Sequence, residues 1–270
     1  MTFGHSELIS KPQFERYIGI DYSGAETPTS GLKGLRVYIA TGEGEAMEVI
    51  PPPGPKRYWT RQTVAHWLLE TLSQTTPTIV CIDHGFSFPL RYFEYHQILP
   101  DWDVFLRDFH RHWPTDEPHI YVDFVRDGLA GNGGARTGDP KWRRITEQRC
   151  RGKSVFHFDC QGSVAKSTHS GIPWLLFLRE RLGKDVHFWP FDGFSPPELR
   201  STIVEAYPSL YKHRFPVGQG MTGDQHDAYV IAQWLRQADA SGELQIALHP
   251  DMDPSMQLLA RVEGWILGVA

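Results

Sequence analysis

Three short apolar runs that each end on an acidic residue constrain the fold of this chain more than any other feature. Residues 78–82 are almost continuously apolar, and Asp83 follows them directly. Such a run is typical of a strand that is buried on both faces of a parallel sheet. Two further runs end in a similar way on Asp21 and on Glu205. Because parallel sheets are covered by helices on both faces, these runs predict an α/β fold.

The other periodic segments predict strands and helices along most of the chain. Strands are expected at 35–40 and 46–50, and Thr60 caps the helix that follows them. The first half therefore has the order strand, strand, strand, helix, strand. The remaining expected elements are a helix at 101–112, strands at 120–125, 155–158 and 186–189, helices at 173–182 and 224–238, the latter capped by Asp224, and a last helix that begins at Pro254.

The composition excludes several classes of protein. The 270 residues contain 27 Lys and Arg against 32 Asp and Glu, a formal net charge of −5, which argues against a uniformly basic nucleic-acid-coating protein. No apolar run approaches the roughly 18 residues that a membrane span needs, and residues 1–16 show no signal-peptide pattern. The three cysteines form no Cys-x-x-Cys pair, which favours reduced thiols. We therefore expect a cytoplasmic protein without a membrane partner.

Acidic residues recur where ligands bind in α/β sheets. Ligands bind outside the carboxyl ends of the strands, where the strand-terminal acids converge if their strands are neighbours. Two more acids, three residues apart, share one face of the helix that they open. Carboxylates this close repel one another unless protons or a cation intervene, and Mg²⁺ prefers such oxygen ligands. We therefore predict that Mg²⁺ or Mn²⁺ binds to Asp21, Asp83, Glu205, Asp224 and Asp227.

The same acids also have a purely structural interpretation. Asp21 and Asp83 precede turn-like sequences, so either could be a turn residue. Asp224 is a good helix N-cap, and Asp227 suits the positive end of the helix dipole. The joint pattern favours chemistry, because strand-terminal acids that follow several buried runs in this order are uncommon by chance.

The arrangement of these acids resembles the RNase H-like fold. That fold has the order β-β-β-α-β, and the resemblance places Asp21 on the first strand, Asp83 on the fourth and Asp227 on the final conserved helix. It covers residues 16–83 and 201–240. The matching phrases are Ile-Gly-Ile-Asp at 18–21, Ile-Asp-His-Gly-Phe at 82–86, Glu-Ala-Tyr-Pro at 205–208 and Asp-Gln-His-Asp-Ala at 224–228, and they are similar to a family of uncharacterised, predicted RNase H-like nucleases.

The resemblance implies a fold and a reaction. The fold is a mixed sheet, with three antiparallel strands and then parallel strands, flanked by helices in a single domain over 1–270 that carries an insertion at 84–192. The reaction is two-metal hydrolysis of phosphodiester bonds, with Asp21, Asp83 and Asp227 as catalytic metal ligands and Glu205 and Asp224 as further candidates. RNase H itself has another acid on its first helix, where this chain has only Glu70, late in the helix. The metal layout is therefore closer to that of Holliday-junction resolvases.

The insertion has the opposite charge to the rest of the chain. Its Gly- and Arg-rich part, 126–166, contains nine basic and four acidic residues, a net charge of +5, which leaves −10 for the remainder. We predict that nucleic-acid phosphates bind to Arg136, Lys141, Arg143, Arg144 and Lys166. Trp142, Phe156 and Phe158 are aromatic rings on which a base can stack. A basic loop that pairs with acids elsewhere is an equal alternative.

Two further segments of this region suggest a role. The glycine-rich residues 128–138 are expected to be mobile or to be ordered by a ligand. Residues 161–168 lack the spacing of a phosphate-binding loop, but as a helix start they can present amides to an anion. His84, next to Asp83, is predicted to be a catalytic proton shuttle.

The sequence supports three functional hypotheses. The first is a metal-dependent nuclease or other phosphodiesterase, with DNA and RNA both open as the partner and the oligomeric state undetermined. The second is an ATP-dependent phosphotransferase of the sugar-kinase and actin type, which shares the core and a turn like residues 21–24 but usually has two such domains. The third is a non-catalytic RNase H-like scaffold that binds nucleic acid or a protein.

Overall fold

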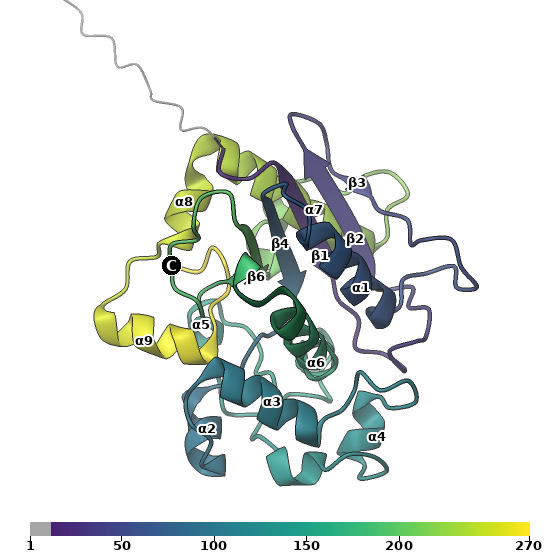
Figure 1. Cartoon of the computed structure of the whole chain (residues 1–270), viewed down its shortest axis with the longest axis vertical. Helices are drawn as coiled ribbons and strands as arrows, with labels where there is room; N and C mark the ends of the chain where they lie inside the picture. The colour runs from purple at the N-terminus through teal and green to yellow at the C-terminus, as the bar shows by residue number, and fades with distance from the viewer. Residues whose placement is uncertain (1–11) are drawn as a thin grey trace, which may run out of the picture.

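A six-stranded mixed sheet forms the centre of the structure, a computed structural model in which residues 12–270 are described (Figure 1). The strand order is β3-β2-β1-β4-β6-β5, with β2 antiparallel to β1 and β3, and with β1, β4, β6 and β5 parallel to one another. The predicted mixed α/β sheet, antiparallel and then parallel, is confirmed. The strands are β1 (Arg16–Asp21), β2 (Arg36–Thr41), β3 (Met47–Glu48), β4 (Thr78–Asp83), β5 (Val186–Phe188) and β6 (Ser201–Glu205).

Helices cover both faces of this sheet. Helix α7 packs on β1 and β2 at one face, whereas α1 and α6 pack together at the other, and Figure 1 shows α2, α3 and α4 gathered beyond the carboxyl end of β4. The helices are α1 (Arg61–Leu72), α2 (Leu90–His96), α3 (Trp102–His112), α4 (Val122–Arg126), α5 (Ile145–Arg149), α6 (Ala165–Leu182), α7 (Gly223–Ser241), α8 (Glu243–Leu248) and α9 (Pro254–Glu263).

The alternation of side chains along the strands divides the core into two clusters. Ile20 and Ile82 belong to the cluster with α1 and α6, whereas Tyr17 and Cys81 belong to the cluster with α7. Successive side chains of a strand point to opposite faces of its sheet, so the two clusters lie on opposite faces. This assignment decides below which strand-terminal acids can meet.

Gly19 in β1 allows α7 to lie unusually close to the sheet. A Cβ atom at this position would come within 2.3 Å of the Ala228 carbonyl oxygen of α7. Helix α7 begins one residue before the predicted cap, because Thr222 and not Asp224 is its N-cap. The Thr222 hydroxyl accepts a hydrogen bond from the Gln225 amide at 3.2 Å. Asp224 lies instead in the first turn, where the helix dipole favours a negative charge.

Two predicted strands and one helix start in the insertion are wrong. The segment 120–125 contains part of helix α4, since its buried Val122 and Val125 have helical spacing. The segment 155–158 is a turn. Helix α6 begins at Ala165, eight residues before Pro173, which sits inside the helix.

The environment of Pro173 explains why the helix continues through it. A proline has no N–H to donate to the carbonyl four residues earlier, which here belongs to His169. The Thr115 hydroxyl donates to that carbonyl instead, at 2.8 Å. The lost helix hydrogen bond is thus replaced by a side chain that is distant in sequence.

Some expectations concern residues outside this description. The predicted absence of a signal peptide in 1–16 and the start of the predicted 1–270 domain both involve residues 1–11, which lie outside the described residues. Within residues 12–270, no helix has the length and apolar character needed to cross a bilayer. The cysteines Cys81, Cys150 and Cys160 form no disulfide in this part of the chain.

Candidate functional site

Asp21 and Asp83 end two adjacent parallel strands at the same level. They are register partners across β1 and β4, so their Cα atoms are separated by one strand spacing, about 4.8 Å. Both side chains follow the alternation of Tyr17 and Cys81 and therefore point to the face that α7 covers. The predicted convergence of these two acids is present in the structure.

Helix α7 brings two further carboxylates to this pair. Burial, and then the charges of Asp83, Asp224 and Asp227, raise the pKa of Asp21 to about 9. Burial, and then the charges of Asp227 and Glu205, raise the pKa of Asp83 to about 8. A shift of this kind means that the site lacks enough positive charge to keep all its carboxylates ionised at neutral pH. We call Asp21, Asp83, Asp224 and Asp227 the carboxylate cluster.

Lys212 is the ammonium group that acts on this cluster. Its Nζ forms an ion pair with Asp227 Oδ1, and its charge lowers the pKa of both Asp21 and Asp83. One charge does not balance the cluster, as the raised pKa values of both aspartates show. Asp83 Oδ1 is buried and has no hydrogen-bond partner among residues 12–270. Such an oxygen is unusual in a folded protein and is available to a cation or a proton.

Glu205 points to the opposite face of the sheet. It is the register partner of Ile82 and not of Asp83, so alternation directs its side chain away from the carboxylate cluster. Arg144 donates to both of its carboxylate oxygens, at 2.6 and 2.7 Å, and the Phe86 amide donates at 3.1 Å. Glu205 is therefore compensated by the protein itself.

Arg144 is the centre of a buried ionic network. It is 1% exposed and also donates to Glu147 Oε1 at 2.8 Å. Burial alone would lower the pKa of Arg144, but the charges of Glu205 and Glu147 raise it above its ordinary value. We call Arg144, Glu147 and Glu205 the Arg144 network. This arginine, predicted to bind phosphate, is occupied by two carboxylates of its own chain.

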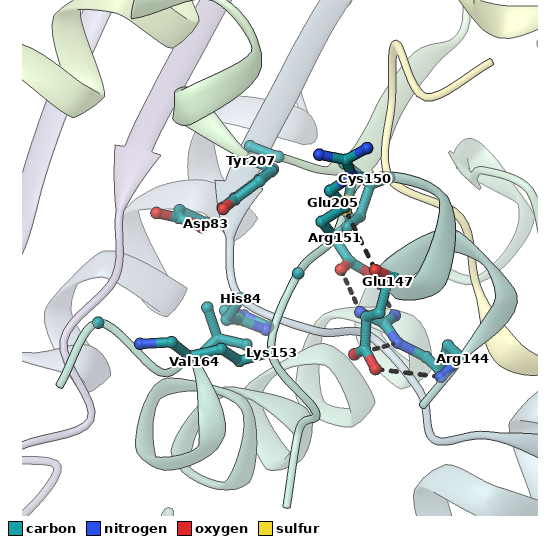
Figure 2. Close-up of a pocket in the computed structure, with 14 residues that line it drawn as sticks. Asp83, His84, Arg144, Glu147, Cys150, Arg151, Lys153, Val164, Glu205 and Tyr207 are labelled. Atoms are coloured by element: carbon teal, nitrogen blue, oxygen red, sulfur yellow. Dashed lines mark hydrogen bonds and ion pairs between the residues drawn. The ribbon is translucent and has the colours of Figure 1, made fainter. Parts of the chain in front are cut away.

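A pocket of about 190 Å³ lies between the cluster and the network (Figure 2). Asp83 and His84 line one side of it and the Arg144 network lines the other, with Tyr207 between them. The cations Arg151 and Lys153 also line it, and neither forms an ion pair with another described residue. The pocket thus combines a strand-terminal carboxylate with two basic side chains, which is the combination that a phosphate ester bound through a cation requires.

The start of α6 closes this end of the sheet. Gly24, in the turn after β1, lies against it so closely that a Cβ atom would meet the Lys166 carbonyl carbon at 2.2 Å. The Gly85 amide, in the turn after β4, donates to the Thr168 hydroxyl at 2.9 Å. Arg61 fixes the first turn from below by donating to the Ala25 carbonyl at 2.6 Å. The loops that carry the cluster are therefore positioned by the protein itself.

His84 is a neutral, buried ring beside the pocket. Its Nδ1 lies 2.9 Å from the Gly85 carbonyl oxygen, so Nδ1 carries the proton. Burial lowers the pKa of His84 to about 4, against the opposing effect of this hydrogen bond. Its Nε2 faces Gly171 of α6, where a Cβ atom would be only 2.4 Å away. The predicted proton shuttle is adjacent to Asp83, and its ring is held in one orientation.

The structure does not bring the predicted phosphate-binding residues together. Arg136 donates to both carboxylate oxygens of Asp108, at 2.6 and 2.9 Å, and Lys166 pairs with Asp123 at 2.7 Å. Lys141 and Arg143 are exposed and form no ion pair within the described part of the chain. Arg151 and Lys153 occupy the pocket instead. Sequence reasoning counted them among nine basic residues but had no signal that separated them from the other seven.

The predicted metal ligands do not form a ready-made metal centre. Within the residues that the structure describes, no group of three or more His, Cys, Asp or Glu side chains is arranged to hold an ion. The donor set still fits a hard divalent cation: oxygen ligands, raised pKa values and an unpartnered Asp83 oxygen. The ammonium of Lys212 currently provides the only side-chain cation in contact with a described residue of the cluster. Metal binding remains a prediction.

Comparison of the chain with family models, curated proteins and solved structures found no match.

Proposed function

We propose that this protein is a divalent-metal-dependent nuclease with an RNase H-like fold. The observation that carries the proposal is the in-register pair Asp21 and Asp83, whose pKa values are raised first by burial and then by neighbouring carboxylates that include Asp227 of α7. The strand order, with three antiparallel strands followed by parallel ones, supports the same fold. The free cysteines are in keeping with the cytoplasm as the compartment.

The carboxylate cluster is the part of the chain that would hold Mg²⁺ or Mn²⁺. We assign Asp21, Asp83 and Asp227 as ligands, with Asp224 as an outer one, and we leave Glu205 out because Arg144 engages both of its oxygens. When bound, such ions activate a water molecule and stabilise the leaving oxygen in phosphodiester hydrolysis. Lys212 would give up its contact with Asp227 as positive charge enters the cluster.

The neighbouring pocket would hold the nucleic-acid backbone. Arg151 and Lys153 line it without an acidic partner among the described residues, and Lys153 Nζ donates to the Gln161 carbonyl oxygen, a contact that a phosphate oxygen would replace. His84 follows Asp83 directly, but its Nε2 faces Gly171 of α6 and burial keeps the ring neutral, so we assign it a positioning role and not proton transfer. In this arrangement the acidic residues of the cluster would bind the metal ions, and the basic residues of the pocket would bind the phosphates. Their opposite charges largely cancel in the net charge of the chain.

The phosphotransferase hypothesis has less support. In that class a similar glycine turn follows the first strand, and two such domains are usual. Here Gly24 of this turn packs against the backbone of Lys166 and Ser167. A non-catalytic scaffold would have no need for aspartates whose pKa values are this far from their ordinary range.

The decisive experiment is cleavage of end-labelled single-stranded, duplex and branched DNA and RNA in the presence of Mn²⁺. We expect products from at least one substrate, and we expect Asp21→Asn to reduce their rate at least about 10³-fold, because it removes a metal ligand. The matched control is Glu70→Gln, which alters an exposed acid on α1 and is expected to leave the rate unchanged.

Metal binding gives a second measurement that does not depend on turnover. Titration with Mn²⁺, followed by the electron paramagnetic resonance signal of the free ion, is expected to show binding to the unaltered protein and weaker binding to Asp21→Asn. No cleavage of any substrate together with no Mn²⁺ binding would contradict the proposal. Hydrolysis of ATP that depends on Asp21 would favour the phosphotransferase instead.

A further inference from the structure

A second pocket lies in the insertion and is lined mainly by aromatic rings. Its volume is about 240 Å³, and Trp113, Phe156, Phe158 and His169 line it together with Arg126. The rings of Trp113 and Phe158 are nearly parallel, with an interplanar angle of 8°. We call this the aromatic pocket. The proposed reaction makes no use of any of these residues.

Trp113, which lines this pocket, has a buried hydrogen-bond donor without a partner among the described residues. The residue is 2% exposed, and its Nε1 has no hydrogen-bond partner in the part of the chain that the structure describes. Buried indole N–H groups usually find an acceptor, and an exception needs an explanation. A ligand that offers an acceptor to Nε1 is such an explanation.

His169 adds a fixed acceptor to the same pocket. Its Nδ1 lies 2.9 Å from the Ala165 carbonyl oxygen and therefore carries the proton. The ring is 1% exposed and neutral, because burial lowers the pKa of His169 to about 3. A neutral ring that donates from Nδ1 has an acceptor at Nε2. The pocket thus presents a donor on Trp113 and an acceptor on His169 among apolar rings.

The glycine-rich segment forms a wall of the pocket. A Cβ atom at Gly138 would meet the ring of Phe156 at 2.4 Å, and one at Gly133 would meet the ring of Trp113 at 2.9 Å. Only glycine lets the backbone lie directly on these rings. The segment 128–138, expected to be mobile or to be ordered by a ligand, is therefore shaped by the aromatic side chains beneath it.

Arg126 adds a cation to the pocket. Its guanidinium carbon lies 5.7 Å from the centroid of the Phe158 ring, and its Nη1 donates to Asp159 at 2.9 Å. The side chain is 36% exposed and its Nε also lies 3.6 Å from Asp127, so a phosphate would have to take the place of Asp159 on this guanidinium. An aromatic ring with a phosphate attached would satisfy both the apolar lining and this cation.

The volume of the pocket fits a heterocycle of one or two rings. An apolar cavity of about 150 Å³ is large enough to bind benzene. The aromatic pocket, at about 240 Å³, has room for a larger ring system. The centroids of Trp113 and Phe158 are 6.2 Å apart, so a planar ligand would lie against these rings and not between them, and it must carry both an acceptor and a donor.

The aromatic pocket and the pocket beside the carboxylate cluster, called here the carboxylate pocket, are lined by neighbouring residues of one short segment. Lys153 and Gly162 line the carboxylate pocket, whereas residues 156–159 line the aromatic pocket. Three residues span at most about 11 Å, so Phe156 cannot be farther than this from Lys153, measured between Cα atoms. One extended nucleic-acid strand can therefore reach both pockets.

We propose that the aromatic pocket binds a nucleobase of a splayed-out nucleotide, with the base against the rings that line the pocket and its phosphate near Arg126. The proposal deepens the proposed function and rests on it for the assignment of the ligand to a nucleic acid. It also assigns a single-stranded or unpaired segment as the part of the substrate that is recognised, because a paired base cannot enter a pocket of this kind.

The test is the binding of free nucleosides to the full chain, measured by saturation-transfer difference NMR with adenosine, guanosine, cytidine and uridine in turn. We expect at least one nucleoside to bind and Trp113→Phe to weaken its binding about five- to tenfold, because the variant keeps the ring but loses the N–H donor. The matched control is Trp174→Phe. Trp174 also has a buried, unpartnered Nε1 among the described residues, but it lines a different cavity, and its variant is expected to bind normally.

Phe158→Leu provides a second variant in case Trp113→Phe does not fold. Phe158 is only partly buried, and its replacement removes the stacking surface while keeping an apolar side chain. We expect it to weaken nucleoside binding as well. Binding that is absent in the unaltered protein, or unchanged in both variants, overturns the proposal.

Asp21→Asn separates this proposal from the proposed function. We expect this variant to lose cleavage and to bind nucleosides as the unaltered protein does. If nucleosides bind but no substrate is ever cleaved, the nuclease proposal fails and the pocket stands as a base-binding site. If cleavage depends on Asp21 but no nucleoside binds, the aromatic pocket proposal fails and the nuclease proposal stands.

Discussion

The strand-terminal acids on the two faces of the sheet lie in opposite electrostatic environments. On the face covered by α7, Asp21 and Asp83 share the ammonium of Lys212 with Asp227, and their pKa values are raised. On the other face, Glu205 is level with Ile82, one residue before Asp83, and receives two hydrogen bonds from Arg144. A strand-terminal acid is therefore not a functional signal by itself. What distinguishes the two sites is whether the protein supplies the opposite charge.

Removing the counter-charge of the Arg144 network is expected to have the largest effect on stability. Arg144→Met would leave the carboxylates of Glu205 and Glu147 buried without a counter-charge. We expect the free energy of unfolding to fall by about 3–5 kcal/mol, which is typical when one partner of a buried ion pair is removed. Urea denaturation at neutral pH measures this change.

A double variant tests whether the loss comes from uncompensated charge. Arg144→Met combined with Glu205→Gln removes a buried negative charge and is expected to recover part of the lost stability. If Arg144→Met alone is as stable as the unaltered protein, the Arg144 network does not hold the two faces in different charge states.

Removing one charge from the carboxylate cluster is expected to raise stability, by less than the loss of Arg144 lowers it. Asp21→Asn removes a group whose repulsion the protein does not balance, so we expect the metal-free variant to be more stable than the unaltered protein at pH 8.5. The expected gain is on the order of 1 kcal/mol, or about 2–4 °C in Tm. Thermal unfolding in the presence of a chelator measures it.

The pH dependence has a definite direction. The folded-state pKa values of Asp21 and Asp83, about 9 and about 8, lie above the ordinary value of 3.8. The folded protein therefore holds more protons than the unfolded chain between about pH 4 and pH 9, and its stability falls as the pH rises through this range. The difference between Asp21→Asn and the unaltered protein should accordingly be smaller at pH 5. A gain that is equal at pH 5 and pH 8.5 would contradict this account.

The smallest expected effect concerns Lys212, the counter-ion of the cluster. Lys212→Gln removes the charge that lowers the pKa of Asp21 and Asp83. Because Lys212 is 40% exposed, we expect a loss of only about 0.5 kcal/mol at pH 8.5 and less at pH 5. Thermal unfolding of Lys212→Gln is compared with that of Lys184→Gln, an exposed lysine in the turn that follows α6, which is expected to change nothing at either pH.

The sequence predicted the sheet and all four acids of the carboxylate cluster because the signals are local, but it wrongly added Glu205 to them. Apolar runs that end on Asp21 and Asp83 describe their own strands, and no distant residue is needed to interpret them. The separation of Glu205 from these acids depends on the register between β6 and β4, which more than one hundred intervening residues leave undetermined. A shift of one residue moves a side chain to the other face.

The insertion was harder to predict because its structure depends on long-range contacts. Helix α6 passes through Pro173 only because Thr115 satisfies a carbonyl that the proline leaves free. Asp108, the partner of Arg136, is 28 residues away, and Glu205, one of the two partners of Arg144, is 61 residues away, so a count of basic residues could not show that both are engaged. Arg151 and Lys153 differ from them only in having no such partner among residues 12–270.

The missing side chain of Gly19 has a consequence for the evolution of the site. Gly19 has only a hydrogen atom facing the Ala228 carbonyl of α7. Any larger side chain would keep the helix farther from β1. The same helix carries Asp227, and the same strand ends on Asp21. A residue with no chemistry of its own thus acts as the spacer of the cluster. A substitution of Gly19 would push α7 away from β1 and so move Asp227 away from Asp21, although neither acid had changed.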